Sequence, residues 1–494
     1  MQRSFAALEL TVFDVLVIGG GITGAGIARD AAMRGLKVAI VDKNDWGSGT
    51  SSRSSRLIHG GIRYLEHGQI KLVRESVHER EILLTIAPHL VRPLEFTWPV
   101  YRGARLPRWK LRAGLTAYDL LAGVGRLRRH EPLSFTEVLA HEPCLQRESL
   151  VGGASYYDAS TDDSRMTLAN VASAVAHGAV AVNYAKMSSL TETTGQVDGA
   201  IVEDSLDSGN EHVRARCVVS ATGPWQAKGT KGSHIAVPRH RIGNRSAVTL
   251  ISPIDGRVMF VIPGGDQAIV GTTDTFTKES PDQVRANESD VDYLLASANE
   301  YFPDARLNRD DVLAAWSGIR PLAAAPSGAD PSSISREHHV EVGRNGLITV
   351  SGGKLTTYRS MAEEVVNKVA AALQKKTPTS RTSDEELPGA DRNEQRAALE
   401  ASEPELARSV IHGLPYTCSD VALAAAQEMA VTVADVMVRR THIAFELADN
   451  GVSASASIAS VMADTLGWDA VTTGAQAAEY EREANRLFSF RESS

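Results

Sequence analysis

The pattern of hydrophobic and polar positions near the N-terminus predicts a strand, a helix and a second strand. A mostly apolar run covers Phe13 to Ile18, and a glycine turn and a helix-like segment, Gly24 to Arg34, follow it. The next apolar run is "LKVAIVDK". Short apolar runs of this kind are typical of strands buried in a parallel sheet, and a helix between two of them is typical of a βαβ unit. The sequence therefore begins with an α/β unit.

Later segments predict a second sheet and a helical end. The segments "ESVHEREILL" and "SRMTLANVASAVAHG" have helical patterns, and the runs "AVAVNYAKMSSLTE", "VDGAIVED" and "HVRARCVVSATG" predict a meander that returns to the first sheet. Between residues 235 and 274, four runs ("HIAVPR", "AVTLIS", "RVMFVIP" and "QAIVGTTD") predict an antiparallel sheet. The polar tract 375–395 is expected to be a linker, and 396–494 a C-terminal helical domain.

Composition and charge narrow the class of protein. The chain has 494 residues, of which 43% are hydrophobic and 23% charged, as in soluble globular proteins. Its net charge of −8 argues against general nucleic-acid binding. Three widely separated cysteines predict neither a disulfide framework nor a zinc site, and we expect no metal. No signal-peptide pattern is present, so we expect a cytoplasmic protein. The most apolar later stretch, "VALAAAQEMAVTVADVMV", contains Gln427, Glu428 and Asp435, which indicates a packed helix.

The first glycine turn has the form of a dinucleotide site. Gly19, Gly21 and Gly24 form GxGxxG directly after a strand and at the start of a helix, the context in which this motif binds a pyrophosphate. The helix N-terminus offers N–H groups to the phosphates. Asp42 ends the second strand, where a carboxylate can accept hydrogen bonds from a ribose hydroxyl. A glycine turn that serves packing alone is the alternative.

Two downstream features favour FAD over NAD. The segment "VVSATGPW" places Ala221, Thr222 and Gly223 after a strand, where small residues let the chain pass close to a bound dinucleotide. The segment "GLITVSGGKLTTYRSMAEEV" is a strand, a double-glycine turn and a helix. Such a turn can aim N–H groups at the negative charge that a reduced flavin accumulates. An ordinary βα turn is the alternative for each feature.

With these motifs in place, the sequence resembles the FAD-dependent, respiratory glycerol-3-phosphate dehydrogenases of the DAAO-like flavoprotein family. The matching strings are "DVLVIGGGITGAGIARDAAMRG", "TSSRSSRLIHGGIRYLEHG", "ATGPW", "KGSHIAVPR", "GTTD", "WSGIRPL" and "SGGKLTTYR". The resemblance implies hydride transfer from C2 of sn-glycerol 3-phosphate to N5 of FAD. The product would be dihydroxyacetone phosphate, and the electrons would pass to membrane quinone.

The resemblance also implies roles for particular residues. Arg63, Tyr64, Arg320 and Arg336 would surround the substrate, His234 would be the general base, and Lys354 would lie at the flavin and the substrate. Of these, His234, Arg320 and Lys354 are the expected catalytic residues. The expected cofactor contacts are Gly19, Gly21, Gly24, Asp42, Thr50, Ser51, Ser52, His59, Gly60, Gly61, Ala221, Thr222, Gly223, Gly353, Lys354, Leu355 and Thr356.

The chemistry of these side chains agrees with that reaction. A guanidinium group pairs two phosphate oxygens at once, so several arginines suit a phosphate dianion. A histidine can accept a hydroxyl proton near neutral pH. For Arg63 an ion pair with Glu66 is the alternative, and for His234 a structural role.

The resemblance implies a domain division and leaves other functions open. It predicts an FAD-dependent oxidoreductase core at 1–374: FAD-binding parts at about 12–100, 150–225 and 340–374 around a parallel Rossmann-type sheet, and a mostly antiparallel substrate-binding sheet at about 226–340 plus 100–150. The segment "QAKGT" before "KGSHI" is shorter than in the family. A catalytically impaired flavin-binding regulatory protein is therefore one alternative, and an oxidase that uses oxygen is another, although the extra insertion typical of oxidases is absent.

A basic segment predicts contact with a membrane. Between residues 101 and 130 eight cationic residues accompany the single acid Asp119, and Trp109, Leu111, Leu115 and Leu120 are interleaved with them. Such a helix can lie on an anionic lipid surface. The resemblance implies attachment near quinone, at the inner face of the cell membrane. A helix packed on its own domain is the alternative. For the oligomeric state, a homodimer is one open alternative.

Overall fold

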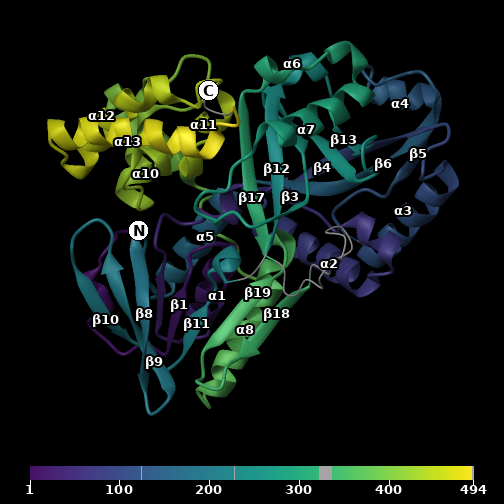
Figure 1. The fold of residues 1–494 in the computed structure, drawn as a ribbon. Coiled ribbons are helices and arrows are strands. Elements are labelled where there is room, and N and C mark those ends of the chain that lie inside the picture. Colours follow the sequence, from purple (N-terminus) through teal and green to yellow (C-terminus); the bar gives the residue numbers. More distant parts are fainter. Residues whose placement is uncertain (124, 227–228, 322–336, 492–494) are drawn as a thin grey trace.

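The computed structural model describes residues 1–123, 125–226, 229–321 and 337–491 (Figure 1). In Figure 1 an α/β part with the N-terminus lies below a second sheet, and the C-terminal helices, in yellow, lie beside both. The architecture confirms the expected class: a parallel sheet, an antiparallel sheet and a helical C-terminal region.

Within the described ranges, the first sheet has six strands in the order β18-β19-β11-β1-β2-β7. The strands β1, β2, β7, β11 and β19 run parallel, and β18 pairs antiparallel at one edge. Every residue of β1 and β2 is buried, as the apolar runs predicted. The bounds are β1 Val15–Ile18, β2 Val38–Val41, β7 Val180–Val182, β11 Val218–Ser220, β18 His338–Val342 and β19 Ile348–Gly352.

Three helices and a small sheet accompany the parallel sheet. Helix α1 (Ile22–Met33) packs between α5 (Asp163–Ala176) and α8 (Tyr358–Ala372). The expected meander is confirmed as an antiparallel sheet of β8 (Ala185–Thr193), β9 (Gln196–Asp204) and β10 (Asn210–Arg214), after which β11 re-enters the first sheet.

The second sheet, counted over the described residues, has ten strands. Its order is β16-β12-β15-β14-β13-β4-β6-β3, with β17 on β12 and β5 on β6. All of its pairs are antiparallel except β13 with β4. The bounds are β3 Leu57–Ile58, β4 Val91–Tyr101, β5 Glu131–Leu133, β6 Leu150–Thr161, β12 Gly229–Pro238, β13 Ala247–Ile251, β14 Val258–Gly264, β15 Gln267–Gly271, β16 Thr275–Thr277 and β17 Ala314–Pro321.

Two long strands lie elsewhere than the sequence-based division placed them. The ranges 12–100 and 150–225 were expected to bind the cofactor, but β4 and β6 lie inside them and belong to the second sheet. They pair with each other over the whole length of β4. An apolar run shows that a strand is buried but does not show which sheet buries it.

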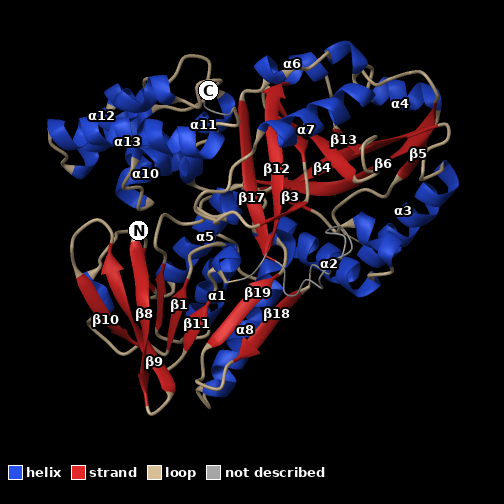
Figure 2. Ribbon diagram, in the orientation of Figure 1, coloured by secondary structure: helices blue, strands red, loops and turns tan. Residues whose placement is uncertain are grey.

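Helices cover both faces of the second sheet (Figure 2). Helix α7 (Glu288–Tyr301) packs against β12, β13 and β15. Helices α2 (Ile70–Ile86) and α3 (Arg108–Ala122) pack against each other, against β6, and against η3 (Ile62–His67), a 3-10 turn. Short helices α4 (Phe135–His141) and α6 (Arg239–Ile242) complete this part.

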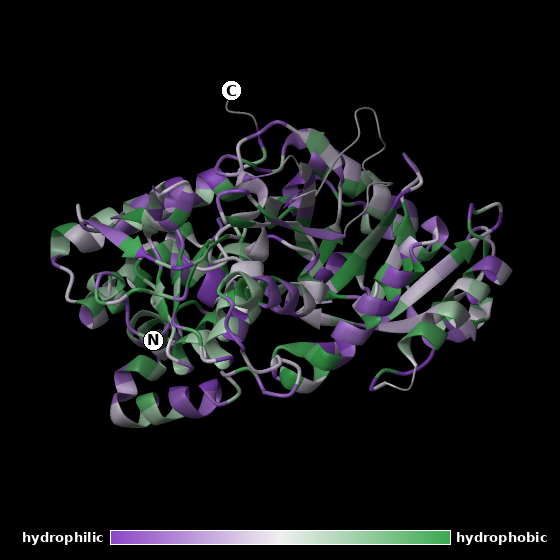
Figure 3. Ribbon diagram, turned by 90° about the horizontal axis from the view of Figure 1, so that it is seen from below, coloured by the Kyte–Doolittle hydropathy of each residue, from purple (hydrophilic) through white to green (hydrophobic). Residues whose placement is uncertain are grey.

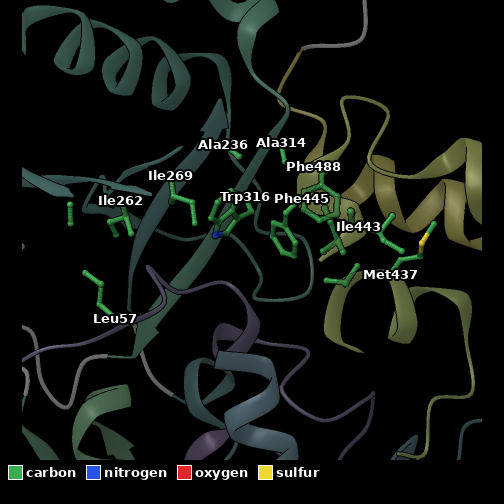
Figure 4. Close-up of a cluster of buried hydrophobic side chains, with 14 of the residues drawn as sticks. Leu57, Ala236, Ile262, Ile269, Ala314, Trp316, Met437, Ile443, Phe445 and Phe488 are labelled. Atoms are coloured by element: carbon green, nitrogen blue, oxygen red, sulfur yellow. The ribbon is translucent and has the colours of Figure 1, made fainter. Parts of the chain in front are cut away.

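The C-terminal helices join the rest through a shared apolar cluster (Figure 4). Phe445 lies edge-to-face against Trp316 of β17, with ring centroids 5.1 Å apart, and against Phe488 at the same distance. The helices are α9 Arg392–Ser402, α10 Cys418–Gln427, α11 Ile443–Glu446, α12 Ser455–Leu466 and α13 Ala470–Phe488. None of the helices in the described ranges is long and apolar enough to span a bilayer.

The expected linker, 375–395, packs on the first domain. Arg29 of α1 donates hydrogen bonds to the carbonyl oxygens of Thr382 and Glu385, and Leu387 is buried. These contacts hold the segment 375–395 against the part of the chain that carries the parallel sheet.

Figure 3 shows hydrophobic positions along the interior strands and mixed positions along the outer helices.

Candidate active site

A cavity of about 620 Å³ lies between the two sheets and brings most of the predicted residues together. Gly24, Ser52, Gly60 and Gly61 are not in its wall, and Arg336 lies outside the described residues. The predicted residues that line it are Gly19, Gly21, Asp42, Thr50, Ser51, His59, Arg63, Tyr64, Ala221, Thr222, Gly223, His234, Arg320, Gly353, Lys354, Leu355 and Thr356.

The glycine turn shows why these positions require glycine. Gly19 has φ +110°, and a Cβ there would lie 2.6 Å from the carbonyl oxygen of Ala221. A Cβ on Gly24 would lie 1.8 Å from the carbonyl oxygen of Gly19, so Gly24 lets α1 pack on the turn. Ile22 N–H, at the start of α1, donates to Ser51 Oγ at 3.0 Å. The turn, the small-residue segment at 221–223 and the Ser51 loop therefore form one cradle at a helix N-terminus, as a pyrophosphate requires.

Asp42 is positioned by backbone hydrogen bonds at the end of β2. Its Oδ2 accepts from Gly20 N–H at 2.6 Å and its Oδ1 accepts from Asn44 N–H at 2.8 Å. Burial raises the pKa of Asp42 to about 6, although both backbone bonds act in the opposite direction. A carboxylate held in this way faces the cavity beside the cradle, where a ribose hydroxyl can donate to it and favour its charged form.

At the opposite end, the loop of His59 to Gly61 is fixed by contacts that the sequence did not indicate. His59 N–H donates to Thr356 Oγ1 at 3.1 Å, which in turn donates to the carbonyl oxygen of His59. Gly60 N–H donates to Asp158 Oδ1 at 3.1 Å. A Cβ on Gly60 would lie 2.3 Å from the Tyr118 hydroxyl. Gly60 therefore acts by packing behind the cavity wall.

Asp158 is the centre of a buried cluster behind this loop. It pairs with Arg80 at 2.5 Å and accepts from the Tyr118 hydroxyl at 2.7 Å. All three side chains are almost fully buried, so each charge is paired where water cannot solvate it. No sequence motif pointed to these residues because they come from α2, α3 and β6 and meet only in the folded chain.

Cationic side chains gather on the wall formed by β17, η3 and the turn after β19. Arg320 donates to Thr272 Oγ1 at 2.8 Å and to the carbonyl oxygen of Thr273 at 3.1 Å, and it pairs with Asp274 at 3.1 Å. Its guanidinium lies over Gly232, where a Cβ would be 2.6 Å from Nη2. These contacts fix the guanidinium while a quarter of the side chain stays exposed.

Arg63 and Lys354 share the ring of Tyr64. The Arg63 guanidinium lies 5.1 Å from that ring and donates to the Tyr64 hydroxyl at 3.2 Å, and Lys354 Nζ lies 4.1 Å from the ring. The carboxylate of Glu66, the alternative partner of Arg63, is instead held by Arg105 at 3.1 to 3.2 Å. Arg63, Lys354 and Arg320 therefore supply three positive charges to one cavity.

His234 is a buried, neutral histidine in the same wall. Its Nε2 lies 2.8 Å from Ser55 Oγ, and its ring stacks on Trp316 with centroids 5.4 Å apart and an interplanar angle of 13°. Burial lowers the pKa of His234 to about 3, and the charges of Arg320 and Arg56 add to the effect. The sequence did not single out Ser55, whose motif holds four serines and one threonine before Leu57.

The shortened segment that precedes His234 in the sequence does not disrupt β12, the strand that carries this histidine. β12 pairs with β17 from Gly229 to Ala236 and with β15 from His234 to Pro238. A Cβ on Gly271, opposite His234, would lie 2.2 Å from the imidazole Cδ2. Both neighbouring strands therefore fix the ring.

The low pKa of His234 predicts a loss of stability in acid. Its ordinary pKa of 6.5 applies to the unfolded chain, which therefore binds a proton more readily than the folded chain. The contribution of neutral His234 to the free energy of unfolding is complete above pH 6.5. It falls by about 1.4 kcal/mol per pH unit as the pH drops towards 3. In denaturant titrations of cofactor-free protein, wild type should lose about 2 kcal/mol more than His234→Gln between pH 7 and 5. The exposed His240→Gln should behave as wild type, and equal losses in all three proteins would contradict the assignment.

Comparisons with known proteins identify the family of the chain. Residues 14–359 match the family described as FAD dependent oxidoreductase, and residues 389–473 match the C-terminal domain of alpha-glycerophosphate oxidase. The chain therefore belongs to the FAD-dependent oxidoreductase family, and FAD is its cofactor.

Several relatives of the chain are named glycerol-3-phosphate dehydrogenase. The chain is 37% identical to a glycerol-3-phosphate dehydrogenase of Synechocystis, over 94% of this chain and 95% of the relative. It is 43% identical to the mitochondrial glycerol-3-phosphate dehydrogenase of Macaca fascicularis over 75% of this chain, which spans about half (54%) of that relative. The X-ray structure of the glycerol-3-phosphate dehydrogenase from Bacillus halodurans complexed with FAD has a TM-score of 0.78 and 30% identity, covering 98% of this chain and 96% of that one.

Proposed function

We propose that the chain oxidises sn-glycerol 3-phosphate to dihydroxyacetone phosphate and passes the electrons to membrane quinone. The observation that carries the proposal is the joint placement of Arg63, Arg320, Lys354 and His234 in the cavity that also contains the glycine cradle. Three cations suit a phosphate dianion, and a neutral imidazole suits the proton of the C2 hydroxyl. The name shared by the relatives supports the same substrate.

The residues of the cavity fit FAD. Gly19, Gly21 and the N-terminus of α1 would hold the pyrophosphate, with Thr50 and Ser51 beside it, and Asp42 would accept hydrogen bonds from the adenosine ribose. His59 and Lys354 would hold the ring end, and the flavin, when bound, would supply the acceptor for the hydride of C2. Six further expected contacts also line the cavity and would touch the cofactor: Ala221, Thr222, Gly223, Gly353, Leu355 and Thr356.

The side chains divide the other tasks. Arg320 and Arg63 would bind the phosphate and orient C2, while the mostly apolar cavity wall excludes water. His234 would hold the hydroxyl proton on an imidazole nitrogen. The phosphate dianion would offset the charges of Arg320 and Arg56, and this would raise the pKa of His234 towards the working pH. The hydrogen bond with Ser55 would keep the ring in place as it becomes charged.

The electron acceptor separates this proposal from an oxidase. The match of residues 389–473 to a domain of alpha-glycerophosphate oxidase is the specific observation that favours oxygen as the acceptor. Turnover in air should show which acceptor is used. We expect dihydroxyacetone phosphate to form with a soluble quinone, with little hydrogen peroxide. Stoichiometric peroxide without quinone would identify an oxidase, and absence of turnover with any acceptor would support the regulatory alternative.

We propose that α3 attaches the enzyme to the inner face of an anionic membrane. Leu111 and Leu115 are buried in the apolar core and cannot enter lipid, but Trp109 and Leu120 are 73% and 75% exposed. Arg105 and Arg108 are engaged by Glu66 and by backbone carbonyl oxygens. The exposed cations of this segment are Arg102, Lys110, Arg112, Arg126, Arg128 and Arg129.

A triple substitution tests this attachment. Changing Lys110, Arg112 and Arg128 to glutamine should lower the affinity for phosphatidylserine vesicles about 100-fold, because each lost charge removes about 1 kcal/mol of attraction. Co-sedimentation with the vesicles measures this affinity. The matched control changes three exposed cations elsewhere, Arg214, Arg344 and Lys376, to glutamine. If both variants bind like wild type, or lose binding equally, α3 is not the attachment site.

A further inference from the structure

Three residues to which the sequence analysis assigned no role meet beside the cofactor cradle. Lys43 follows Asp42, Trp225 follows the segment 221–223, and Asp282 lies in the loop between β16 and α7. Lys43 Nζ pairs with Asp282 Oδ1 at 2.6 Å, and Trp225 Nε1 donates to Asp282 Oδ2 at 3.1 Å. Lys43 Nζ also lies 4.5 Å from the centroid of the Trp225 ring. Each of the three side chains therefore contacts the other two.

This cluster lies over one end of the cavity. Lys43 and Trp225 are both part of the cavity wall. The Trp225 ring covers Gly49, where a Cβ would lie 3.0 Å from Cζ3 and Cη2. Gly49 directly precedes the Thr50–Ser52 turn. The cluster therefore stands at the part of the cavity between Asp42 and Ser51, the part assigned above to the ADP half of FAD.

Asp282 connects Lys43 and Trp225 to two other parts of the chain. Asp282 belongs to the part of the chain that carries the second sheet, and its carbonyl oxygen accepts a hydrogen bond from Arg486 of α13. Arg486 is held in turn by Glu483 at 2.5 Å. Lys43 and Trp225 come from the parallel-sheet domain. One aspartate thus links three parts of the fold at the mouth of the cofactor cavity.

Packing alone does not account for the cluster. Trp225 is 38% exposed, and the side chains of Lys43 and Asp282 are 33% and 47% exposed. An exposed ion pair contributes little to folding stability. A tryptophan that keeps more than a third of its surface in water gains less from burial than one in the core. What distinguishes the cluster is its position: Lys43 and Trp225 line the cavity, and Asp282 contacts both of them.

We propose that Lys43, Trp225 and Asp282 form a clasp that closes over the ADP half of FAD and slows its release. The inference rests on the position of FAD proposed above. FAD can leave only when the clasp opens, and opening breaks an ion pair, a charge-assisted hydrogen bond and a cation–π contact together. Because the ion pair is partly exposed, its contribution falls as the salt concentration rises.

The release rate of FAD from the purified holoenzyme tests the clasp. FAD fluorescence rises on release, so the rate after dilution can be followed without catalysis. Asp282→Ala should release FAD about tenfold faster than wild type, and high salt should accelerate wild type more than this variant. Trp225→Phe, which keeps an aromatic ring but removes the Nε1–H donor, should also release faster. The exposed Asp304→Ala is the matched control and should release at the wild-type rate.

The outcomes separate this inference from the proposed function. If Asp282→Ala and Trp225→Phe release FAD at the rate of the control, the clasp is wrong while the function stands. If Asp282→Ala does not fold, Trp225→Phe decides by the same comparison. If wild type takes up no FAD, the proposed function and the clasp both fail. A faster release in both variants, with the extent of flavin reduction by glycerol 3-phosphate unchanged, supports the clasp.

Discussion

Replacing Arg320 by alanine should raise the KM for glycerol 3-phosphate by at least about 30-fold, because loss of a charged partner of a phosphate costs about 2–5 kcal/mol. The guanidinium is oriented before the substrate arrives, by Thr272, the carbonyl oxygen of Thr273 and Asp274. Arg320→Lys should recover only part of the affinity, since an ammonium group lacks the planar fork that pairs two phosphate oxygens. Steady-state kinetics of the FAD-loaded variants measure both effects.

The control for Arg320 must separate binding from folding. Asp274 is 3% exposed, so removing Arg320 changes the environment of a buried carboxylate. FAD content and thermal unfolding of Arg320→Ala should therefore be measured beside its kinetics. A variant that holds FAD and has the wild-type KM would show that Arg320 does not bind the phosphate.

Replacing His234 should act on the rate and not on affinity. We expect His234→Gln to lower kcat by about 10² to 10⁴ with a much smaller change in KM, since a general base acts mainly in the transition state. Ser55→Ala, which removes the hydroxyl 2.8 Å from Nε2, should lower kcat less and shift the acidic limb of the pH–rate profile. The exposed His240→Gln should leave both constants unchanged.

The kinetic constants of His234→Gln decide whether His234 is the general base. If His234→Gln keeps the wild-type kcat across neutral pH, another group takes the proton. If instead KM rises and kcat is unchanged, His234 binds the substrate without accepting its proton.

Local patterns predicted the cofactor end of the site better than its surroundings. The GxGxxG turn, Asp42 and the segment 221–223 each follow an apolar strand, and the parallel sheet brings the ends of such strands to one edge. The pattern could not show that Gly60 acts by packing, because its neighbour Tyr118 is 58 residues away in sequence and meets it only in the fold. The same holds for Asp158 and Arg80.

The contacts of the C-terminal helices were also beyond the reach of the sequence. Arg439 and Arg440 both bind the buried Asp45, three residues after Asp42, at 2.7 Å. They directly follow the stretch 421–438, for which the sequence predicted only a packed helix. A local pattern does not show which distant residue will pair with a buried charge. In the basic segment the helix itself was predicted, but the positions of its apolar side chains were not. Of the four expected to face lipid, Leu111 and Leu115 are buried in the core, and Trp109 and Leu120 are exposed to solvent.

The most direct test of the whole account is an anaerobic titration of the purified, FAD-loaded protein with sn-glycerol 3-phosphate, followed by flavin absorbance. The account predicts that the oxidised flavin spectrum bleaches as substrate is added, that dihydroxyacetone phosphate forms in equal amount, and that glycerol without phosphate leaves the spectrum unchanged. An unchanged spectrum with glycerol 3-phosphate, in protein that holds FAD, would contradict it.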